Sequence, residues 1–443
     1  AGAATAQDEP PASGLFSGSV RVDVVNLEVF VTDGRGDPVF GLTRGDFELL
    51  VDGRVMEISN FRPPPNPGAD AALEIPEEMV SDEPAPPRHL AVFVDRSNFL
   101  PDRRDEVMAS LRQFLAARRA AGDLVMVAAY DAKLEVLSPF DDDAAGLERA
   151  LGTLDRTSSS AFDSRAEFNR ILRCLEVTCQ MPEYLWDSVR IYAREERYKS
   201  RKMLAHFAAF IDSLAALPGR RSVLFVSDGI AVRPGESLFA AYQQYFNWVE
   251  HYGPIEYSIE ANRYSLTGDL EDLTNLANQR RVTIYSLNGG GIVGNRYATG
   301  AVAVAGSQLV DNEIDFIREA NYLGSLERFS GATGGRTLFK PTDETLADVR
   351  QDLESGYSLG FNPDHEPDNR SRSITVRVSA DGVKVRHRRN YRLASDEDRN
   401  AESARLALLT TESDNPLLVE VDFSPDAARQ SRKHVVSASV RIP

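Results

Sequence analysis

The chain has 443 residues, which is more than one ordinary hydrophobic core holds and predicts about two to four domains. Apolar residues make up 42% of it and charged residues 26%, as in water-soluble globular proteins, and no run of about 18 apolar residues predicts a transmembrane segment. The formal net charge of −17 argues against a surface that binds nucleic acid.

The first residues, AGAATAQDEPPASG, resemble the small-residue sequence that remains after a signal peptidase has cut. We therefore expect residues 1–18 to be the processed N-terminal tail of an exported protein. Such a protein would be periplasmic, bound at the cell surface or extracellular.

Residues 19–62 predict the first part of a β-sandwich. Alternating apolar residues in SVRVDVVNLEVFVTD are typical of strands, and Asp52-Gly53 predicts a two-residue turn between the strands FELLV and VMEI. Residues 63–87 are rich in proline and acidic residues and have no periodicity, which is typical of an extended linker.

Residues 88–355 alternate apolar strands with amphipathic helices. This alternation predicts an α/β domain with a doubly wound, mainly parallel sheet of Rossmann-like type and helices on both faces. Ligands of such sheets bind at the carboxyl ends of the strands. Strands are expected at 90–94, 124–130, 222–227 and 282–287, and helices around 107–115, 187–217, 269–280 and 343–355.

The sequence returns to strand patterns after the α/β domain. Residues 356–395 contain GYSLGF, RSITVRVSA and KVRHRRNYR, too few strands to bury one face alone. We expect them to pair with the strands of residues 19–62, so that the α/β domain is inserted in an all-β sandwich. Residues 396–443 are again strand-like, and we interpret them as the start of a further β domain.

Oxygen-bearing side chains follow two of the predicted parallel strands. Asp95 and Ser97 come after the strand at 90–94, and Asp228 comes after the strand at 222–227. Because parallel strands end at the same edge of a sheet, these side chains are candidates for a site that holds a hard cation. Carboxylates at strand ends are also common as caps and turn residues, so the spacing alone leaves both interpretations open.

These residues and their surroundings resemble the von Willebrand factor type A domain, and more closely the secreted bacterial "VWFA-related" proteins of acidobacterial type. The family's metal motif is Asp-x-Ser-x-Ser after the first strand, a threonine in a second loop and an aspartate after a later strand, which together hold Mg²⁺. The resemblance extends over residues 20–395 in the family's order. The stretches that carry it are VNLEVFVTDGRGDPVFGLTRGDFELLVDG, LAVFVDRSN, GDLVMVAAYD, LPGRRSVLFVSDG and GATGGRTLFKPTDETLADVRQDLESGYSLGFNP.

The resemblance implies a metal site that is incomplete in this chain. Asp95 and Ser97 match the first two positions of the motif, and Asp228 matches the later aspartate. Phe99 replaces the final serine, and its ring has no oxygen to offer a cation. Thr157 in DRTSSSAFDSR corresponds to the second-loop threonine, although each of the three following serines is an alternative. We therefore expect Mg²⁺ to bind weakly or not at all.

Cys174 and Cys179 lie five residues apart in RCLEVTCQ, and an oxidising compartment would permit a local disulfide between them. Two unpaired thiols are the alternative. A disulfide would require a break in the helix, because the two residues are about one and a half helical turns apart. Two unpaired thiols would leave the helix regular.

Two motifs resemble enzyme signatures but lack the context that the chemistry needs. GYSLG at 356–360 matches the nucleophile-elbow pattern around Ser358, but another strand follows it instead of a helix. GGGIVG at 289–294 matches a dinucleotide-binding pattern, but it comes after most of the sheet has been formed. The sequence therefore predicts a protein that is not an enzyme, with a serine hydrolase using Ser358 as a distant alternative.

The predicted function is that of an exported protein-binding module of the von Willebrand A type, serving adhesion or recognition. Its protein partner would contact the loops at the top of the sheet, around residues 97–103, 155–165, 228–240 and 288–310. The alternative is a structural subunit of a larger envelope or extracellular assembly, homo- or hetero-oligomeric and independent of metal, in which the tail strands add to another chain.

Overall fold

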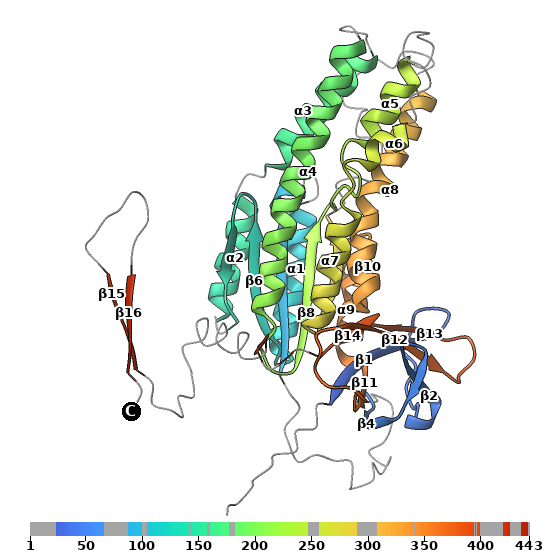
Figure 1. Cartoon of the computed structure of the whole chain (residues 1–443), viewed down its shortest axis with the longest axis vertical. Coiled ribbons are helices and arrows are strands. Elements are labelled where there is room, and N and C mark those ends of the chain that lie inside the picture. Colours follow the sequence, from blue (N-terminus) through green and yellow to red (C-terminus); the bar gives the residue numbers. More distant parts are fainter. Residues whose placement is uncertain are drawn as a thin grey trace, which may run out of the picture.

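The computed structural model shows a central α/β unit, two antiparallel sheets beside one end of it, and a C-terminal hairpin (Figure 1). Within the described residues, no helix is both long and apolar enough to cross a lipid bilayer. The structure describes residues 24–65, 87–99, 104–140, 143–156, 160–176, 182–246, 257–289, 308–340, 342–393, 395, 397–398, 420–425 and 436–441.

The central sheet has the strand order β10-β9-β8-β5-β6-β7 in the described chain. Every neighbouring pair is parallel except β6 and β7, which run antiparallel. The prediction of an α/β fold with a mainly parallel sheet is therefore confirmed. The strands are β5 (Arg88–Asp95), β6 (Leu124–Tyr130), β7 (Leu134–Ser138), β8 (Arg220–Ser227), β9 (Val282–Asn288) and β10 (Thr337–Leu338).

Helices cover both faces of this sheet, and the alternation of side chains along β5 shows why. Leu90, Val92 and Val94 face the cluster that includes side chains of α1, α2 and α9, whereas Ala91 and Phe93 face the cluster that includes those of α4, α7 and α8. A strand that is buried on both sides is expected to be apolar on both faces, as β5 is from Leu90 to Val94. The helices are α1 (Arg104–Ala120), α2 (Ala144–Arg156), α4 (Pro182–Ser213), α7 (Thr267–Gln279), α8 (Gln308–Thr333) and α9 (Asp343–Ser355).

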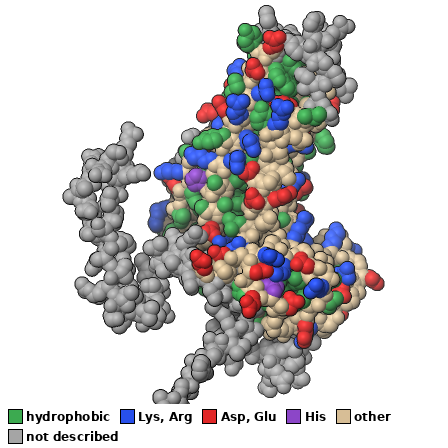
Figure 2. All heavy atoms as spheres, viewed as in Figure 1, with side chains coloured by type: hydrophobic (Ala, Val, Ile, Leu, Met, Phe, Trp, Pro, Cys, Tyr) green, Lys and Arg blue, Asp and Glu red, His purple; other side chains and the backbone are tan. Residues whose placement is uncertain are grey.

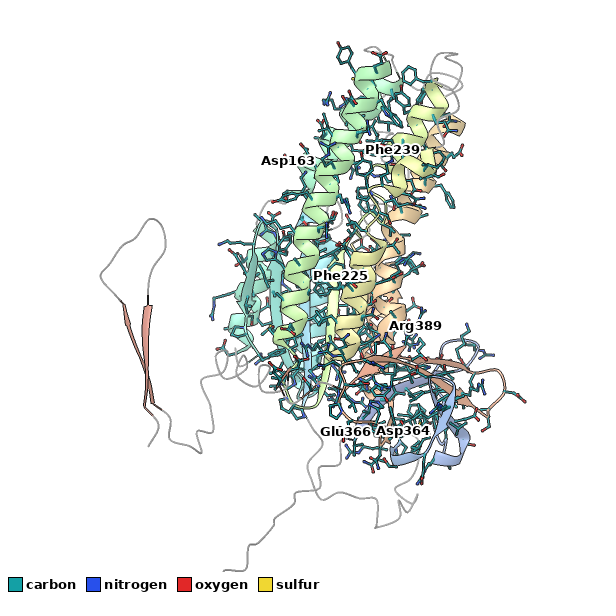
Figure 3. All side chains as sticks on the ribbon, viewed as in Figure 1. Asp163, Phe225, Phe239, Asp364, Glu366 and Arg389 are labelled. Atoms are coloured by element: carbon teal, nitrogen blue, oxygen red, sulfur yellow. The ribbon has the colours of Figure 1, made fainter. Side chains whose placement is uncertain are left out.

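Two of these helices extend far past the carboxyl end of the sheet (Figure 1). With 32 residues, α4 is about 48 Å long, whereas an eight-residue strand measures about 27 Å. The N-terminal halves of α4 and α8 pack with α3 (Ala161–Glu176), α5 (Glu236–Phe246) and α6 (Tyr257–Asn262) around a separate apolar cluster. We call this assembly the helical cap. Figure 3 shows Phe239 inside the cap and Phe225 at the level of the sheet.

The strands that flank the α/β unit in the sequence pair with one another in space. The two antiparallel sheets have the orders β13-β1-β11-β4 and β14-β12-β2-β3, and their buried side chains form one shared cluster. Asp52 and Gly53 both have positive φ, 47° and 78°, between β2 and β3, which confirms the predicted two-residue turn. The strands are β1 (Val25–Thr32), β2 (Phe47–Val51), β3 (Arg54–Met56), β4 (Ile58–Arg62), β11 (Tyr357–Phe361), β12 (Ser371–Val378), β13 (Lys384–His387) and β14 (Asn390–Arg392).

Near the end of the chain, β15 (Glu420–Pro425) and β16 (Val436–Arg441) form an antiparallel hairpin. The strands predicted between residues 396 and 443 are therefore present. The predicted N-terminal tail, residues 1–18, and most of the predicted linker, residues 66–86, lie outside the described residues.

Candidate functional site

The candidate site lies where the connectivity of the sheet reverses. From β5 the chain first adds β6 and β7 on one side, and then crosses to the other side to add β8 and β9. Such a switch point leaves a crevice at the carboxyl ends of the two central strands, here β5 and β8. Asp95 is the last residue of β5, and Asp228 directly follows β8.

The structure brings the predicted residues of these two strand ends together. A short 3₁₀ helix, η3 (Arg96–Asn98), turns the chain after Asp95, and the Asp228 N–H donates a hydrogen bond of 2.7 Å to the Asn98 carbonyl. The Ser227 hydroxyl donates to Asp95 Oδ2 at 3.1 Å and so links the two strands through side chains. The expectation that Asp95, Ser97 and Asp228 share one edge of the sheet therefore agrees with their positions.

The carboxylate of Asp95 is fully buried and surrounded by neutral donors. Ser97 Oγ donates to its Oδ1 at 2.5 Å, and Asn98 Nδ2 donates to its Oδ2 at 3.0 Å, in addition to the bond from Ser227. Burial raises the pKa of Asp95 above its ordinary value, because the hydrogen bonds from these neighbours only partly offset the loss of hydration.

Phe99 does not lie in the position of a ligand. Its side chain is 2% exposed and belongs to the apolar cluster on the α1 face of the sheet. The ring lies close to Gly289 at the end of β9, where an added Cβ would be 2.4 Å from a ring carbon and 2.7 Å from Asp228 Oδ1. The ring therefore forms an apolar wall beside the Asp228 carboxylate, and only glycine fits at position 289.

The helical cap lies over the crevice and narrows it. A cavity of about 40 Å³ remains between the sheet and the cap, room for a few water molecules at most. Its walls include Ser97, Asn98 and Asp228 from the sheet and Ser164, Arg165, Tyr192, Glu196, Arg318 and Tyr322 from the cap.

Polar contacts hold the cap side of this cavity in place. Glu196 accepts hydrogen bonds from Ser164 Oγ at 2.8 Å and from Lys199 Nζ at 2.9 Å. The Arg318 guanidinium lies 4.1 Å from the centre of the Phe168 ring, a cation–π contact. Burial raises the pKa of Tyr322 to about 12, so this hydroxyl stays neutral at physiological pH.

The residues present do not fit a Mg²⁺ site. Mg²⁺ needs near-octahedral oxygen coordination, but the oxygens of Asp95 already accept three hydrogen bonds, and Phe99 contributes no oxygen. The guanidinium groups of Arg165 and Arg318 bring positive charge to the same cavity. In the part of the chain that the structure describes, no three His, Cys, Asp or Glu side chains are grouped as metal ligands.

The other sequence-predicted residues are placed as follows. Thr157 and Cys179 lie outside the described residues, so the second-loop ligand and the disulfide stay predictions. Cys174 is partly buried on α3 beside the cap cluster. Residues 290–294 of the glycine motif are likewise outside the described residues.

Ser358 does not lie on a nucleophile elbow. It is the second residue of β11 and pairs with Glu28 on one side and Arg62 on the other, inside an antiparallel sheet. Two of the downstream histidines are engaged elsewhere, since His365 contacts the Tyr391 hydroxyl at 2.9 Å and His387 Nε2 accepts from the Val376 N–H at 3.2 Å, whereas His434 lies outside the described residues. In the described residues Ser358 therefore lacks the strand–turn–helix setting of a nucleophile elbow.

The predicted partner loops also require a correction. Residues 228–240 were predicted to contact the partner, but most of them are buried. Val232 donates its N–H to the Asn321 carbonyl of α8, and Arg233 N–H donates to the Asn321 side chain. The cause is the helical cap, which the sequence analysis did not predict and which covers this loop.

The cap residues that line the cavity were missed as well. The sequence signal that could have found them is length, because residues 131–219 are far more than one crossover between parallel strands requires.

No model of a protein family matches the sequence, and no curated protein matches it either.

Among solved structures, the chain is similar to the human COPII-coat protein Sec24c, with a TM-score of 0.22 and 10% sequence identity. The similarity covers 70% of this chain and 44% of that one. The chain thus spans less than half the length of the protein that it matches.

Proposed function

We propose that the chain is an exported, VWFA-related protein-binding module of the von Willebrand A type that works without a metal ion at the top of its sheet. The placement of Asp95, Ser97 and Asp228 at the switch point supports this family assignment. The pairing of the flanking strands, and the apolar cluster that their two sheets share, support the β-sandwich that would carry the α/β domain.

The observation that carries independence from metal is the charge of the small cavity between the sheet and the cap. Its lining includes two carboxylates, Asp228 and Glu196, and two guanidinium groups, Arg165 and Arg318. These four formal charges cancel, so the cavity needs no divalent cation for neutrality. The cap also lies over the carboxyl ends of β5 and β8, and the space of about 40 Å³ that is left gives a partner carboxylate little room to reach a cation there.

The outer surface of the cap is the partner site that we propose in place of the sheet-top loops. Tyr184, Ile191 and Tyr198 of α4 are 65%, 53% and 71% exposed. They are seven residues apart, almost two full turns, so they form one row about 21 Å long. Figure 2 shows apolar side chains between basic ones over α3 and α4. Apolar groups aligned in this way are typical of protein interaction surfaces.

Isothermal titration of Mg²⁺ and Mn²⁺ into the metal-stripped protein tests the metal-independent mode. We expect no saturable heat and no shift in melting temperature, with Asp95→Ala behaving like the native chain. Saturable binding that Asp95→Ala abolishes would contradict the proposal and restore the family's cation-dependent mode.

Site-specific photo-crosslinking tests the proposed partner surface. A photoreactive residue at Ile191 should give a covalent adduct with a protein of the native source, whereas one at Val136, which is 52% exposed on β7, should give none. Equal adducts at both positions, or none at Ile191, would remove the α4 row as the binding surface.

The structural-subunit alternative has one observation in its favour. In the described chain β15 pairs with β16 alone, and an isolated hairpin is barely stable in water without a further strand. Strand addition from another copy would supply that pairing. Light scattering decides between the two, since a stable multimer favours the subunit and a monomer favours the binding module.

A further inference from the structure

Arginines gather at the amino end of the central sheet, where it meets the antiparallel sheets near Arg389 (Figure 3). Arg221 lies in β8, opposite Val282 of β9, so it is a neighbour of Arg281. Arg388 lies between β13 and β14, and its Nη1 donates to the Asn278 carbonyl at 3.5 Å, the same oxygen that the Arg281 N–H approaches at 3.2 Å. We call Arg221, Arg281 and Arg388 the arginine cluster.

Two of these guanidinium groups, those of Arg221 and Arg388, are incompletely hydrogen-bonded although their Nε atoms are buried. Arg388 is only 8% exposed, and its Nη2 donates to the Asn26 carbonyl at 2.8 Å. Arg221 donates through Nη1 to the Leu214 and Ala215 carbonyls. Among the described residues, the buried Nε–H groups of Arg388 and Arg221 have no acceptor. An unsatisfied charged donor inside a protein is costly, which indicates a missing partner.

The acceptors that contact Arg220, Arg221 and Arg388 do not balance the charge of these three groups. The negative charge of Glu28 stabilises the charged forms of both Arg221 and Arg388, but this carboxylate already forms an ion pair with Arg220 Nε at 2.6 Å. Arg221 and Arg388 also approach the C-termini of α4 and α7, each worth about half a negative charge. Glu28 and the two helix ends thus offset about two of the three positive charges of Arg220, Arg221 and Arg388.

The pKa values of Arg221 and Arg388 are lowered, in agreement with this excess of positive charge. Burial, together with the charges of Arg281 and Arg221, lowers the pKa of Arg388 to about 9. Burial and the charge of Arg281 lower the pKa of Arg221 to about 10. Both groups lose part of their preference for the charged form, as expected where a counter-ion is lacking.

We propose that the arginine cluster binds one small free oxyanion, of the inorganic phosphate or sulfate class, between the Nε–H groups of Arg221 and Arg388. Guanidinium groups bind such oxygens with strong, charge-assisted hydrogen bonds. Arg281 is exposed and Arg221 is partly exposed, so an ion can enter from solvent at that side. The burial of Arg388 leaves less space for a phosphoryl group that is attached to a larger molecule. The site is independent of the proposed protein-binding function, because it lies at the opposite end of the sheet.

Isothermal titration of sodium phosphate into the full 443-residue chain, at constant ionic strength and pH 7, tests the site. We expect saturable binding of one phosphate per chain. Arg388→Met should weaken it about tenfold or more, because a charged hydrogen-bond donor is lost. Arg377→Met is the matched control, since Arg377 is 65% exposed on β12 and pairs with Glu48, and it should leave the affinity unchanged.

Arg221→Lys provides a second variant in case Arg388→Met does not fold. It keeps the positive charge but removes the Nε–H, so phosphate should again bind more weakly. O-phosphoserine should bind less well than phosphate to the native chain. The proposal is overturned if the native chain shows no saturable binding, or if neither cluster variant weakens binding more than Arg377→Met does. Equal affinity for O-phosphoserine would overturn the enclosed, free-ion form of the site.

Discussion

The two ends of the central sheet carry charge in different ways. At the carboxyl end, Asp95 is held by neutral donors from its own strand end and from β8, and the carboxylates of the cavity face arginines of the cap. At the amino end, the guanidinium groups of Arg220, Arg221 and Arg388 lie near the carboxylate of Glu28, and these residues come from segments far apart in the sequence. The first end can be neutral by itself, whereas the second depends on the antiparallel sheets and, as we propose, on an anion.

The largest effect is expected at Asp352, which holds the amino end together. Its side chain is 1% exposed and accepts from Arg336 at 2.8 and 2.9 Å and from Arg386 at 2.6 Å. Asp352→Ala leaves two partly buried cations without their partner and should lower the free energy of unfolding by about 3 kcal/mol.

Urea unfolding measures this loss, and Asp348→Ala is its control. Asp348 is 47% exposed and lies 3.6 Å from the same Arg336, so its replacement should cost less than about 1 kcal/mol. Equal losses for the two variants would mean that the amino end does not depend on buried pairing, and the contrast between the ends would disappear.

The next effect concerns the carboxyl end and is steric. Gly289→Ala places a methyl group against the buried Phe99 ring and Asp228, and should lower the free energy of unfolding by about 2 kcal/mol. Gly268→Ala, in α7 with nothing within 4 Å of the added Cβ, should cost nothing. Thermal unfolding of both variants checks this, and a harmless Gly289→Ala would show that Phe99 is not packed as described.

A smaller effect on the free energy of unfolding is expected from Asp95, and it should depend on pH. Because its pKa is raised in the folded protein, the folded state binds more protons than the unfolded state, and this carboxyl lowers stability as pH rises above about 4. Asp95→Asn removes that dependence. The stability of the variant relative to the native chain should therefore increase from pH 4 to pH 7, by about 1.4 kcal/mol per unit of pKa shift.

Asp33→Asn should show the opposite sign in the same denaturation series. Backbone N–H groups, that of Asp37 foremost, lower the pKa of Asp33, so the variant should lose stability relative to the native chain as pH rises. The same direction for both variants would contradict the burial that we assign to Asp95.

The smallest effect belongs to the exposed face of the antiparallel sheets. Arg377 and Glu48 pair at 3.0 Å with side chains 65% and 45% exposed. Arg377→Ala should change the free energy of unfolding by about 0.5 kcal/mol or less, as for most surface ion pairs. A loss as large as that of Asp352→Ala would show that burial does not separate the two kinds of pair.

The sequence alone predicts those helices and strands in which apolar residues recur at a single regular spacing. The strands that became β5, β6, β8 and β9, and the helix that became α9, lie where they were predicted, because each buries its apolar residues in a regular pattern. The pairing of Asp95 with the end of β8 followed from the rule that parallel strands end at one edge.

The helical cap could not be predicted in the same way. Most residues of α5 are buried, so it has no polar face to mark its period. In α8, Ile314 packs in the cap cluster and Phe329 packs against the sheet, so its apolar residues follow two different faces. The positions of Arg165, Arg318 and Arg388 depend on contacts between distant segments, which local patterns do not contain.

The pairing of β1 with β11, in which Val25 lies opposite Phe361, has a consequence for the order in which the chain folds. Synthesis releases β1, β2 and β4 long before β11 and β12, with which they pair, exist. Folding of the α/β unit, from Arg88 to Ser355, then brings both ends of that long segment to one place and removes most of the entropic cost of joining them. A chain interrupted after Ser355 would fold its centre but leave β1 and β4 without β11 and β2 without β12, and such open strand edges invite aggregation.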